Sequence, residues 1–270
     1  MPIVNEYSDG TGIVAYALRD ADGTVVSRRN SDVRMYAAST IKLAVAMAVI
    51  KQVDAGSLSW DETIPATHEF ESGVGGRFSL LDQDDEYDKL FPAVGTPMSI
   101  RDLLGIMIDR SSNEATDMLL ERIGLAAVQE LCRECGMSLL HIERLIGDIA
   151  ARAQGRPNEV TADELSALML QAVHGDWTSR EHRDVLRGAL SRQVYPVIAD
   201  ELPAGTYWGS KSGSVTGIEH DCAFIGDPDG DDLLVLAVCT RGYEERPAQE
   251  IIRTVADAVL TPYFPRIATY

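Results

Sequence analysis

Ser39 and Lys42 stand three positions apart, at the start of an apolar segment that runs to Ile50. Residues at this spacing share a helix face, and a helix that is apolar nearly all round belongs in the protein interior. A buried amine tends to lose its proton, and a neutral amine beside a hydroxyl is a general base beside a nucleophile. The pair therefore predicts nucleophilic acyl chemistry, with the N–H of Ser39 available to an oxyanion. Taken alone, the pair also fits a helix cap and a lysine that reaches the surface.

Two other polar triplets follow in the chain. Ser111-Ser-Asn113 lies at the break between two expected helices, and Lys211-Ser-Gly213 closes an expected strand. Each triplet also has a purely structural explanation. The first could cap a helix, and the second could mark the end of a strand. Together with Ser39-x-x-Lys42 they correspond, in order, to the S-x-x-K, S-D-N and K-T-G motifs, with Ser112 in place of the aspartate and Ser212 in place of the threonine. On these motifs, and on strings such as Asp221-Cys-Ala-Phe-Ile225, the chain resembles the serine β-lactamase and penicillin-binding protein superfamily, most closely its class A branch.

This resemblance implies a role for each matching residue. Ser39 would be the acylated nucleophile, and Lys42 the base that activates it. Ser111 would relay a proton to the leaving group, and Asn113 would orient Lys42 and the substrate amide. The residues implied to bind substrate or the oxyanion are Lys211, Ser212, the backbone N–H groups of Ser39 and Ser214, and Arg241, a further candidate for a substrate carboxylate.

The segment from Leu140 to Asn158 departs from the family pattern. Class A enzymes that deacylate efficiently carry a glutamate in an E-x-x-L-N setting, which this segment lacks. Asp148 falls nearest the expected position, and Glu143 lies about one helical turn earlier. A general base must contact its proton directly or through one water, and Asp148 is one methylene shorter than glutamate. We therefore expect weak deacylation, with Asp148 either the base or a structural residue paired with an arginine such as Arg144 or Arg156.

The pattern of elements predicts an α/β (α+β) fold. Strand-like runs lie near both chain ends, with a hairpin signal at Asp22-Gly23, whereas the middle is helical, with caps expected at Ser99, Thr161 and Thr178. We expect an antiparallel sheet of about five strands, flanked by helices, and an inserted helical subdomain with the active site at their interface. The expected single catalytic domain comprises a sheet subdomain (1–52 and 195–270) and a helical subdomain (53–194). Residues 140–158 are expected to form a long ordered loop.

Composition limits the partners. The chain has 270 residues, with 24 basic and 42 acidic side chains and a formal charge of −18. This charge opposes nucleic acid and anionic membranes as partners. No apolar leader is recognised, so a cytoplasmic location is expected. The five histidines are scattered, so no metal or cofactor is expected, and His220 is expected at a surface or strand end.

The expected partner is a small molecule that carries a carboxylate and an amide or ester. Two of the four lysines, Lys42 and Lys211, belong to the motifs that would bind it. The first interpretation is a β-lactamase-like serine acyl-hydrolase. Two alternatives remain: a cytosolic esterase, peptidase or transacylase on another substrate, and a non-catalytic penicillin-binding or scaffold relative.

Overall fold

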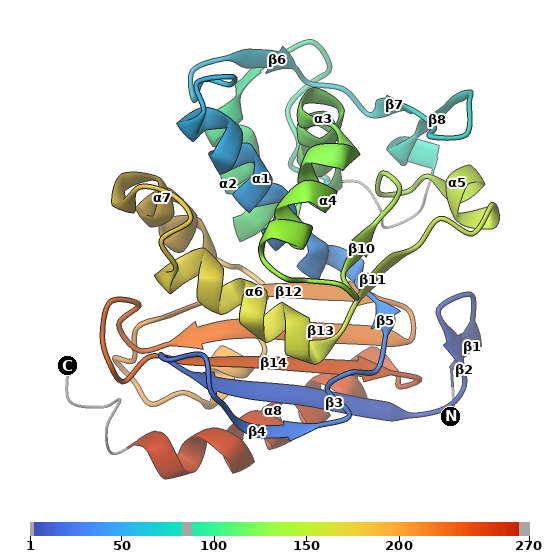
Figure 1. Cartoon of the computed structure of the whole chain (residues 1–270). Coiled ribbons are helices and arrows are strands. Elements are labelled where there is room, and N and C mark those ends of the chain that lie inside the picture. The colour runs from blue at the N-terminus through green and yellow to red at the C-terminus, as the bar shows by residue number, and fades with distance from the viewer. Residues whose placement is uncertain (1–2, 83–87, 265–270) are drawn as a thin grey trace.

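The computed structural model describes residues 3–82 and 88–264, and a five-stranded antiparallel sheet lies at its centre (Figure 1). Its strands come from both ends of the chain: β3 (Ile13–Asp20), β4 (Val25–Arg29), β12 (Trp208–Val215), β13 (Ile218–Ile225) and β14 (Leu234–Arg241). Their order across the sheet is β12-β13-β14-β3-β4. The expected fold class is therefore confirmed.

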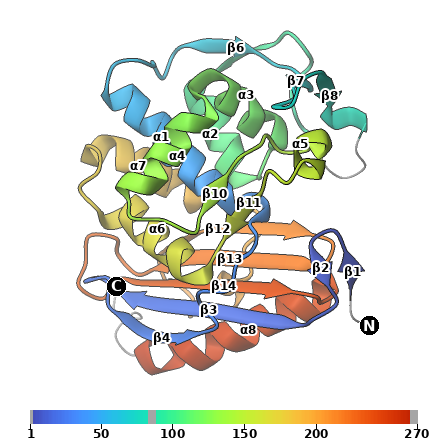
Figure 2. The same ribbon diagram turned by 45° about the vertical axis from the view of Figure 1, so that its right-hand side comes forward.

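Helices cover both faces of this sheet (Figure 2). They are α1 (Lys42–Asp54), α2 (Ile100–Asp109), α3 (Asn113–Ile123), α4 (Leu125–Glu134), α5 (Ile149–Ala153), α6 (Ala162–His174), α7 (Arg180–Leu190) and α8 (Glu245–Leu260). Helix α8 packs against β13 and β14 on the outer face, and α6 packs against β3, β13 and β14 on the inner face. Strands β13 and β14 are almost wholly buried between these layers. The apolar sequence of β14 requires this, whereas β13 is buried although it carries Glu219, His220 and Asp221.

Short elements join the main ones. The 3₁₀ turns are η1 (Ala38–Ile41), η2 (Leu80–Asp82), η3 (Ile198–Glu201) and η4 (Thr261–Tyr263). The short strands are β1 (Val4–Asn5), β2 (Ser8–Asp9), β5 (Met35–Tyr36), β6 (Thr63–Pro65), β7 (Glu69–Glu71), β8 (Arg77–Ser79), β9 (Pro97–Ser99), β10 (His141–Ile142) and β11 (Asn158–Val160). Strand β5 joins β11 and β10 in a small sheet beside η1, so the chain just before Ser39 is held by backbone pairing.

Two of the three expected helix caps are confirmed. Ser99 accepts a hydrogen bond from the N–H of Asp102, and Thr161 accepts one from Glu164. The third expectation is wrong by one residue, because Ser179 rather than Thr178 caps α7. The Thr178 hydroxyl instead donates to Asp54.

Three other expectations need correction. The helix expected from Ser39 starts as the 3₁₀ turn η1, and α1 proper begins at Lys42. The triplet Lys211-Ser-Gly213 lies in the middle of β12 and does not end it, because pairing with β13 continues to Val215. The segment 140–158 is not a plain loop, since it forms β10, α5 and β11. In each case long-range packing prevails over weak local propensity.

The boundaries of the two expected subdomains stay predictions. Helix α1, most of which was expected to belong to the sheet subdomain, packs against α2, α3, α4 and α6. Within the described residues, no helix is long and apolar enough to cross a membrane.

Candidate active site

Ser39 lies in η1, immediately before the buried helix α1. Ala38 has φ +45°, in the left-handed region that a residue with a Cβ rarely adopts, so the surrounding structure holds this turn in place. Lys42, which begins α1, is fully buried, and its Nζ lies 2.9 Å from Ser39 Oγ. The Ser39 hydroxyl caps no helix here, since neither η1 nor α1 has a side-chain cap. The base–nucleophile pair predicted from sequence is therefore brought together.

The break between α2 and α3 supplies two more groups. Ser112 caps α3 by accepting a hydrogen bond from Ala115 N–H, and Ser111 before it has φ +64°. This strained conformation directs both the carbonyl and the hydroxyl of Ser111 at Lys42 Nζ, at 2.7 and 3.2 Å. Asn113 Oδ1 lies 2.6 Å from the same nitrogen. A left-handed residue costs roughly 1–2 kcal/mol, which this convergence of contacts offsets.

The partners of Lys42 suit the role of a base. The Ser111 carbonyl and Asn113 Oδ1 can only accept hydrogen bonds, whereas a hydroxyl can also donate. A neutral lysine has two N–H groups and one lone pair. If the two N–H groups go to the carbonyl and amide oxygens, the lone pair is left for a hydroxyl. Ser39 Oγ–H is therefore able to donate its proton to Lys42.

Lys211 reaches the same cluster from β12. Its Nζ donates to Ser111 Oγ at 3.0 Å and to the carbonyl of Ser212 at 2.7 Å. Burial lowers the pKa of Lys211 well below its ordinary value, and the positive charge of Lys42 lowers it further. Ser111 Oγ thus lies between two amines, and a proton can pass along hydrogen bonds that link Ser39, Lys42, Ser111 and Lys211.

Gly213 allows β12 to lie against the nucleophile turn. A Cβ at this position would stand 2.8 Å from the backbone nitrogen of Ser39 and 2.9 Å from that of Thr40. Such distances are shorter than real carbon contacts, so only glycine fits without a shift. Ser214 follows directly, and the structure therefore brings its backbone close to η1, where an oxyanion hole made with the Ser39 N–H was expected.

Asp148 is fully buried, and its carboxylate already has three donors. Oδ1 accepts from Ser72 Oγ at 3.0 Å and from Ala151 N–H at 2.9 Å, and Oδ2 accepts from Gly73 N–H at 2.9 Å. These bonds cap α5 and tie it to the turn between β7 and β8. None of them is to the cluster around Lys42. The role of Asp148 as a base stays a prediction, and its contacts are those of a structural residue.

The other predicted residues lie apart from the cluster. Glu143 is partly exposed and its backbone N–H donates to Asn158 Oδ1. Arg241 ends β14, which β13 separates from β12, and its role in binding a carboxylate stays a prediction. The expectation for His220 is wrong. It is fully buried, and its Nε2 lies 2.9 Å from the carbonyl of Tyr36, because β13 passes behind η1.

Sequence reasoning missed two buried acids near the cluster. Asp117 lies one turn after Asn113 on α3, a spacing that could have placed it on the same face. Its Oδ1 accepts from Ile146 N–H at 2.8 Å, whereas Oδ2 has no partner in the described part of the chain. Burial raises the pKa of Asp117 well above its ordinary value. The second acid, Glu219, pairs with Ser214 across β12 and β13.

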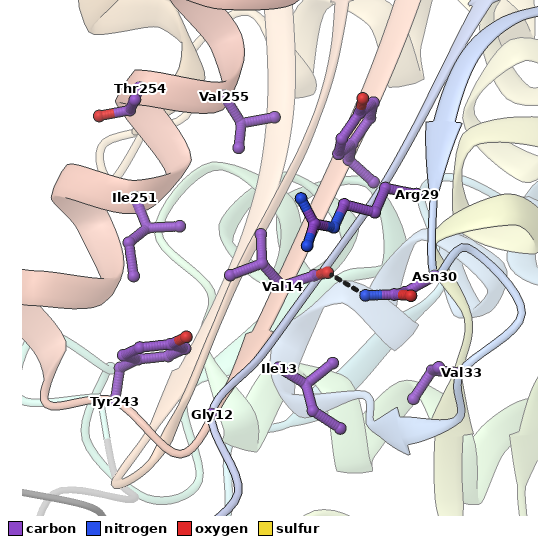
Figure 3. A pocket seen from close by; sticks show the side chains of 11 residues that line it. Gly12, Ile13, Val14, Arg29, Asn30, Val33, Tyr243, Ile251, Thr254 and Val255 are labelled. Atoms are coloured by element: carbon purple, nitrogen blue, oxygen red, sulfur yellow. Dashed lines mark hydrogen bonds between the residues drawn. The ribbon is translucent and has the colours of Figure 1, made fainter.

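A groove of about 500 Å³ lies away from this site, on the outer face of the sheet (Figure 3). Val14 and Tyr16 of β3 line one side, and Ile251 and Val255 of α8 line the other. The sheet separates it from η1, so it takes no part in the chemistry of Ser39. Among residues 3–82 and 88–264, no group of three or more acidic, histidine or cysteine side chains could hold a metal ion.

A five-stranded sheet covered by helices, with a serine, two lysines and a second serine joined by hydrogen bonds, defines a serine acyl-transfer enzyme. The model of the β-lactamase enzyme family matches residues 2–263, and the chain belongs to this family. The β-lactamase ROB-1 of Haemophilus influenzae is 24% identical over 223 residues, which cover 80% of this chain and 68% of that protein.

Solved structures agree with this assignment. The crystal structure of a β-lactamase from Sphaerobacter thermophilus DSM 20745 has 28% identity and a TM-score of 0.77, and the match covers 93% of this chain and 92% of that one. An ancestral class A β-lactamase (GNCA), with 24% identity and a TM-score of 0.77 over 93% of this chain and 94% of that one, shares the fold. The chain is thus a hydrolase of the β-lactamase family with a class A fold.

Proposed function

We propose that the protein opens β-lactam amides through a covalent acyl-enzyme on Ser39. The observation that carries this proposal is the position of Lys42 Nζ, 2.9 Å from Ser39 Oγ and bonded to the Ser111 carbonyl and Asn113 Oδ1. Ser39 Oγ attacks the carbonyl carbon while its proton passes to Lys42. The N–H groups of Ser39 and Ser214 stabilise the oxyanion.

Collapse of this intermediate breaks the carbon–nitrogen bond and leaves the acyl group on Ser39. The leaving nitrogen takes its proton from Ser111, which recovers one through Lys42. Lys211, 3.0 Å from Ser111 Oγ, stabilises the charge that develops there. Water then attacks the ester and regenerates Ser39. This last step is slow, because the hydrogen bonds of Asp148 from Ser72, Ala151 and Gly73 occupy the carboxylate expected to activate the water.

Intact-mass spectrometry after mixing with benzylpenicillin tests both steps. We expect a rapid gain of one penicillin mass and a slow return to the free mass. The variant Ser39→Ala is expected to gain no mass, whereas Ser57→Ala, at an exposed serine, behaves as wild type. A covalent adduct on Ser39→Ala would overturn the assignment of the nucleophile. A protein that is never acylated would fit the non-catalytic penicillin-binding or scaffold alternative.

The slow step also favours a second candidate, transfer of the acyl group to an amine. An acyl-enzyme that water attacks slowly survives long enough for another nucleophile to attack it. If added amines shorten the adduct lifetime and an amide product forms, the protein is a transacylase. The cytoplasmic location and the lack of nucleic-acid partners stay predictions, which cell fractionation and a nucleic-acid binding assay test.

A further inference from the structure

Helix α8 has more apolar surface than its contact with the sheet uses. Its buried residues form one stripe that faces β13 and β14, and they are Ala248, Ile252, Ala256 and Leu260. A second stripe runs beside the first at the i, i+4, i+8 spacing of one helix face, and it consists of Ile251, Val255 and Val259, all only partly buried. The outer side of a surface helix is normally polar, so this second stripe is suited to contact with a further molecule.

Arg29 reaches into the groove between α8 and β3 from the edge strand β4. Strand pairing places it directly opposite Tyr16, and side chains opposite one another in antiparallel strands share a face. Tyr16 packs against an apolar cluster to which α8 contributes, so Arg29 stands on the outer face of the sheet. Figure 3 shows its side chain extended over Val14 towards the helix. The preceding residue, Arg28, pairs with the fully buried Ala17 and therefore lies on the inner face.

The groove carries a positive charge that its own walls do not neutralise. Among the described residues that line it, Arg29 is the one charged side chain, and the others are apolar, aromatic or neutral polar. The guanidinium of Arg29 has no ion pair or hydrogen bond within residues 3–82 and 88–264. The chain has 42 acidic and 24 basic residues, so acids that could pair with Arg29 are abundant elsewhere on the molecule. This cation is therefore available to an anion from outside the chain.

Local hydrogen bonds fix the backbone around Arg29. Asn30, the next residue, has φ +48°, in the left-handed region, and its Nδ2 donates to the Val14 carbonyl at 3.0 Å. Two residues before Arg29, Ser27 Oγ lies 3.3 Å from the hydroxyl of Tyr16. The end of β4 is thus tied to β3 on both sides of Arg29, although β4 lies at an edge of the sheet. A backbone that is ordered before binding reduces the entropic cost of holding a ligand.

We propose that this groove is a second binding site, for a small amphipathic anion in which one carboxylate or sulfonate is joined to an aromatic or aliphatic body. The guanidinium of Arg29 donates paired hydrogen bonds to the anionic oxygens. The apolar body lies between Val14 on the sheet and Ile251 and Val255 on α8. The volume of about 500 Å³ falls within the range of roughly 300–1,000 Å³ that is typical of small-molecule sites. The sheet separates this site from Ser39, so the inference does not depend on the proposed function.

Anilinonaphthalene sulfonate and its neutral parent, N-phenylnaphthylamine, form a matched pair of fluorescent probes, since they share one aromatic body and differ in the sulfonate. The dissociation constant of each is measured by fluorescence titration of the full chain, as wild type and as Arg29→Gln. We expect the sulfonate to bind about tenfold more weakly to Arg29→Gln, because the variant removes the charge that pairs with it. The neutral amine should bind both proteins equally. An unchanged dissociation constant for the sulfonate in folded Arg29→Gln protein overturns the proposal.

Two further variants locate the effect in the groove. Arg28→Gln removes the same charge from the same strand but on the inner face, so it should bind the sulfonate as tightly as wild type. Val255→Asp places a negative charge on the opposite wall and should weaken binding of the sulfonate about tenfold. If Arg28→Gln weakens binding as much as Arg29→Gln, net charge alone attracts the probe and the proposed site is wrong.

Sedimentation velocity at the same protein concentrations tests another occupant of the groove, a second copy of the chain. We expect wild type and Val255→Asp to sediment alike. A wild-type dimer that dissociates in Val255→Asp, together with no binding of the sulfonate, would show that a second copy covers the groove and would overturn the small-anion site. None of these measurements involves Ser39, so they hold whether or not the protein is acylated.

Discussion

The cluster around Ser111 and the carboxylate of Asp148 are both buried, and both join segments that are distant in sequence, but they are built for different tasks. In the cluster, the amines of Lys42 and Lys211 both form hydrogen bonds with the Ser111 hydroxyl, which can donate as well as accept a proton. At Asp148, three fixed donors occupy the carboxylate, and two of them are backbone N–H groups. The first arrangement can move a proton, whereas the second holds a loop in place. This difference is the structural basis of the proposal that Ser39 is acylated faster than the acyl-enzyme is hydrolysed.

The largest effect on the acylation rate is expected at Lys42. Lys42→Met keeps the volume of the side chain and removes the base, so acylation by benzylpenicillin is expected to slow by about 10²–10⁴-fold. Lys51→Met, at a partly exposed lysine of the same helix that pairs with Glu134, is the matched control and should acylate at the wild-type rate. Thermal unfolding shows whether each variant is folded. Acylation within about threefold of wild type in folded Lys42→Met protein would show that another group takes the proton.

The next largest effect is expected at Gly213, where no titratable group is involved. In Gly213→Ala the new Cβ meets the backbone nitrogens of Ser39 and Thr40, so β12 must move away from η1. Misplacement of catalytic groups by about 1 Å costs on the order of 10²-fold in rate. We expect the acylation rate constant to fall by about 10- to 100-fold. It is measured by rapid mixing and acid quenching, followed by intact-mass spectrometry.

Gly105→Ala supplies the control for this variant. Gly105 lies in α2, where a Cβ would meet nothing within 4 Å, and alanine there favours the helix by about 1 kcal/mol. It should acylate normally and unfold at a slightly higher temperature. Equal acylation rates for the two alanine variants would mean that close contact between β12 and η1 is not needed.

The two regions also differ in what the sequence could predict. Ser39, Lys42, Ser111, Asn113 and Lys211 were found because each is a reactive residue type in a short motif, and helix spacing already relates Ser39 to Lys42. The strands and most helices were found because apolar periodicity reports burial. In contrast, two of the three partners of Asp148, Ser72 and Gly73, come from the turn after β7, and no local pattern relates them to a residue so far along the chain. Glu219 was missed for the same reason, because its neighbour Ser214 depends on strand register.

Asp148→Asn separates the structural role from the catalytic one. The amide cannot accept from both Ser72 and Gly73 as the carboxylate does, so stability is expected to fall by about 2 kcal/mol, or about 4–8 °C in Tm. The lifetime of the penicillin adduct should change by less than about threefold, because the three hydrogen bonds that the carboxylate accepts hold it in its structural position. Glu143→Gln, at the other acid considered, should leave both quantities unchanged. An adduct that lives 100 times longer in Asp148→Asn would make Asp148 the deacylating base after all.

The smallest expected effect concerns Asp117, which links the two regions because α3 carries it and its Oδ1 holds Ile146 of the 140–158 segment. Its folded-state pKa is raised by burial, so its contribution to stability is full below pH 3.8 and is lost as pH rises towards that folded-state pKa. Asp117→Asn keeps the acceptor for Ile146 and removes the buried charge. The variant should therefore match wild type near pH 4 and gain about 2–4 °C in Tm at pH 8.

The same substitution bears on the chemistry of Lys42. A negative charge on Asp117 would favour the protonated amine, whereas a neutral side chain leaves Lys42 free to act as a base. Acylation by Asp117→Asn is therefore expected to be as fast as in wild type, or faster above pH 7. Glu121→Gln, at an exposed acid on the same helix, controls for a change of net charge. A Tm gain that does not depend on pH, or a loss of acylation, would show that Asp117 is ionised in the folded protein and that Lys42 depends on its charge.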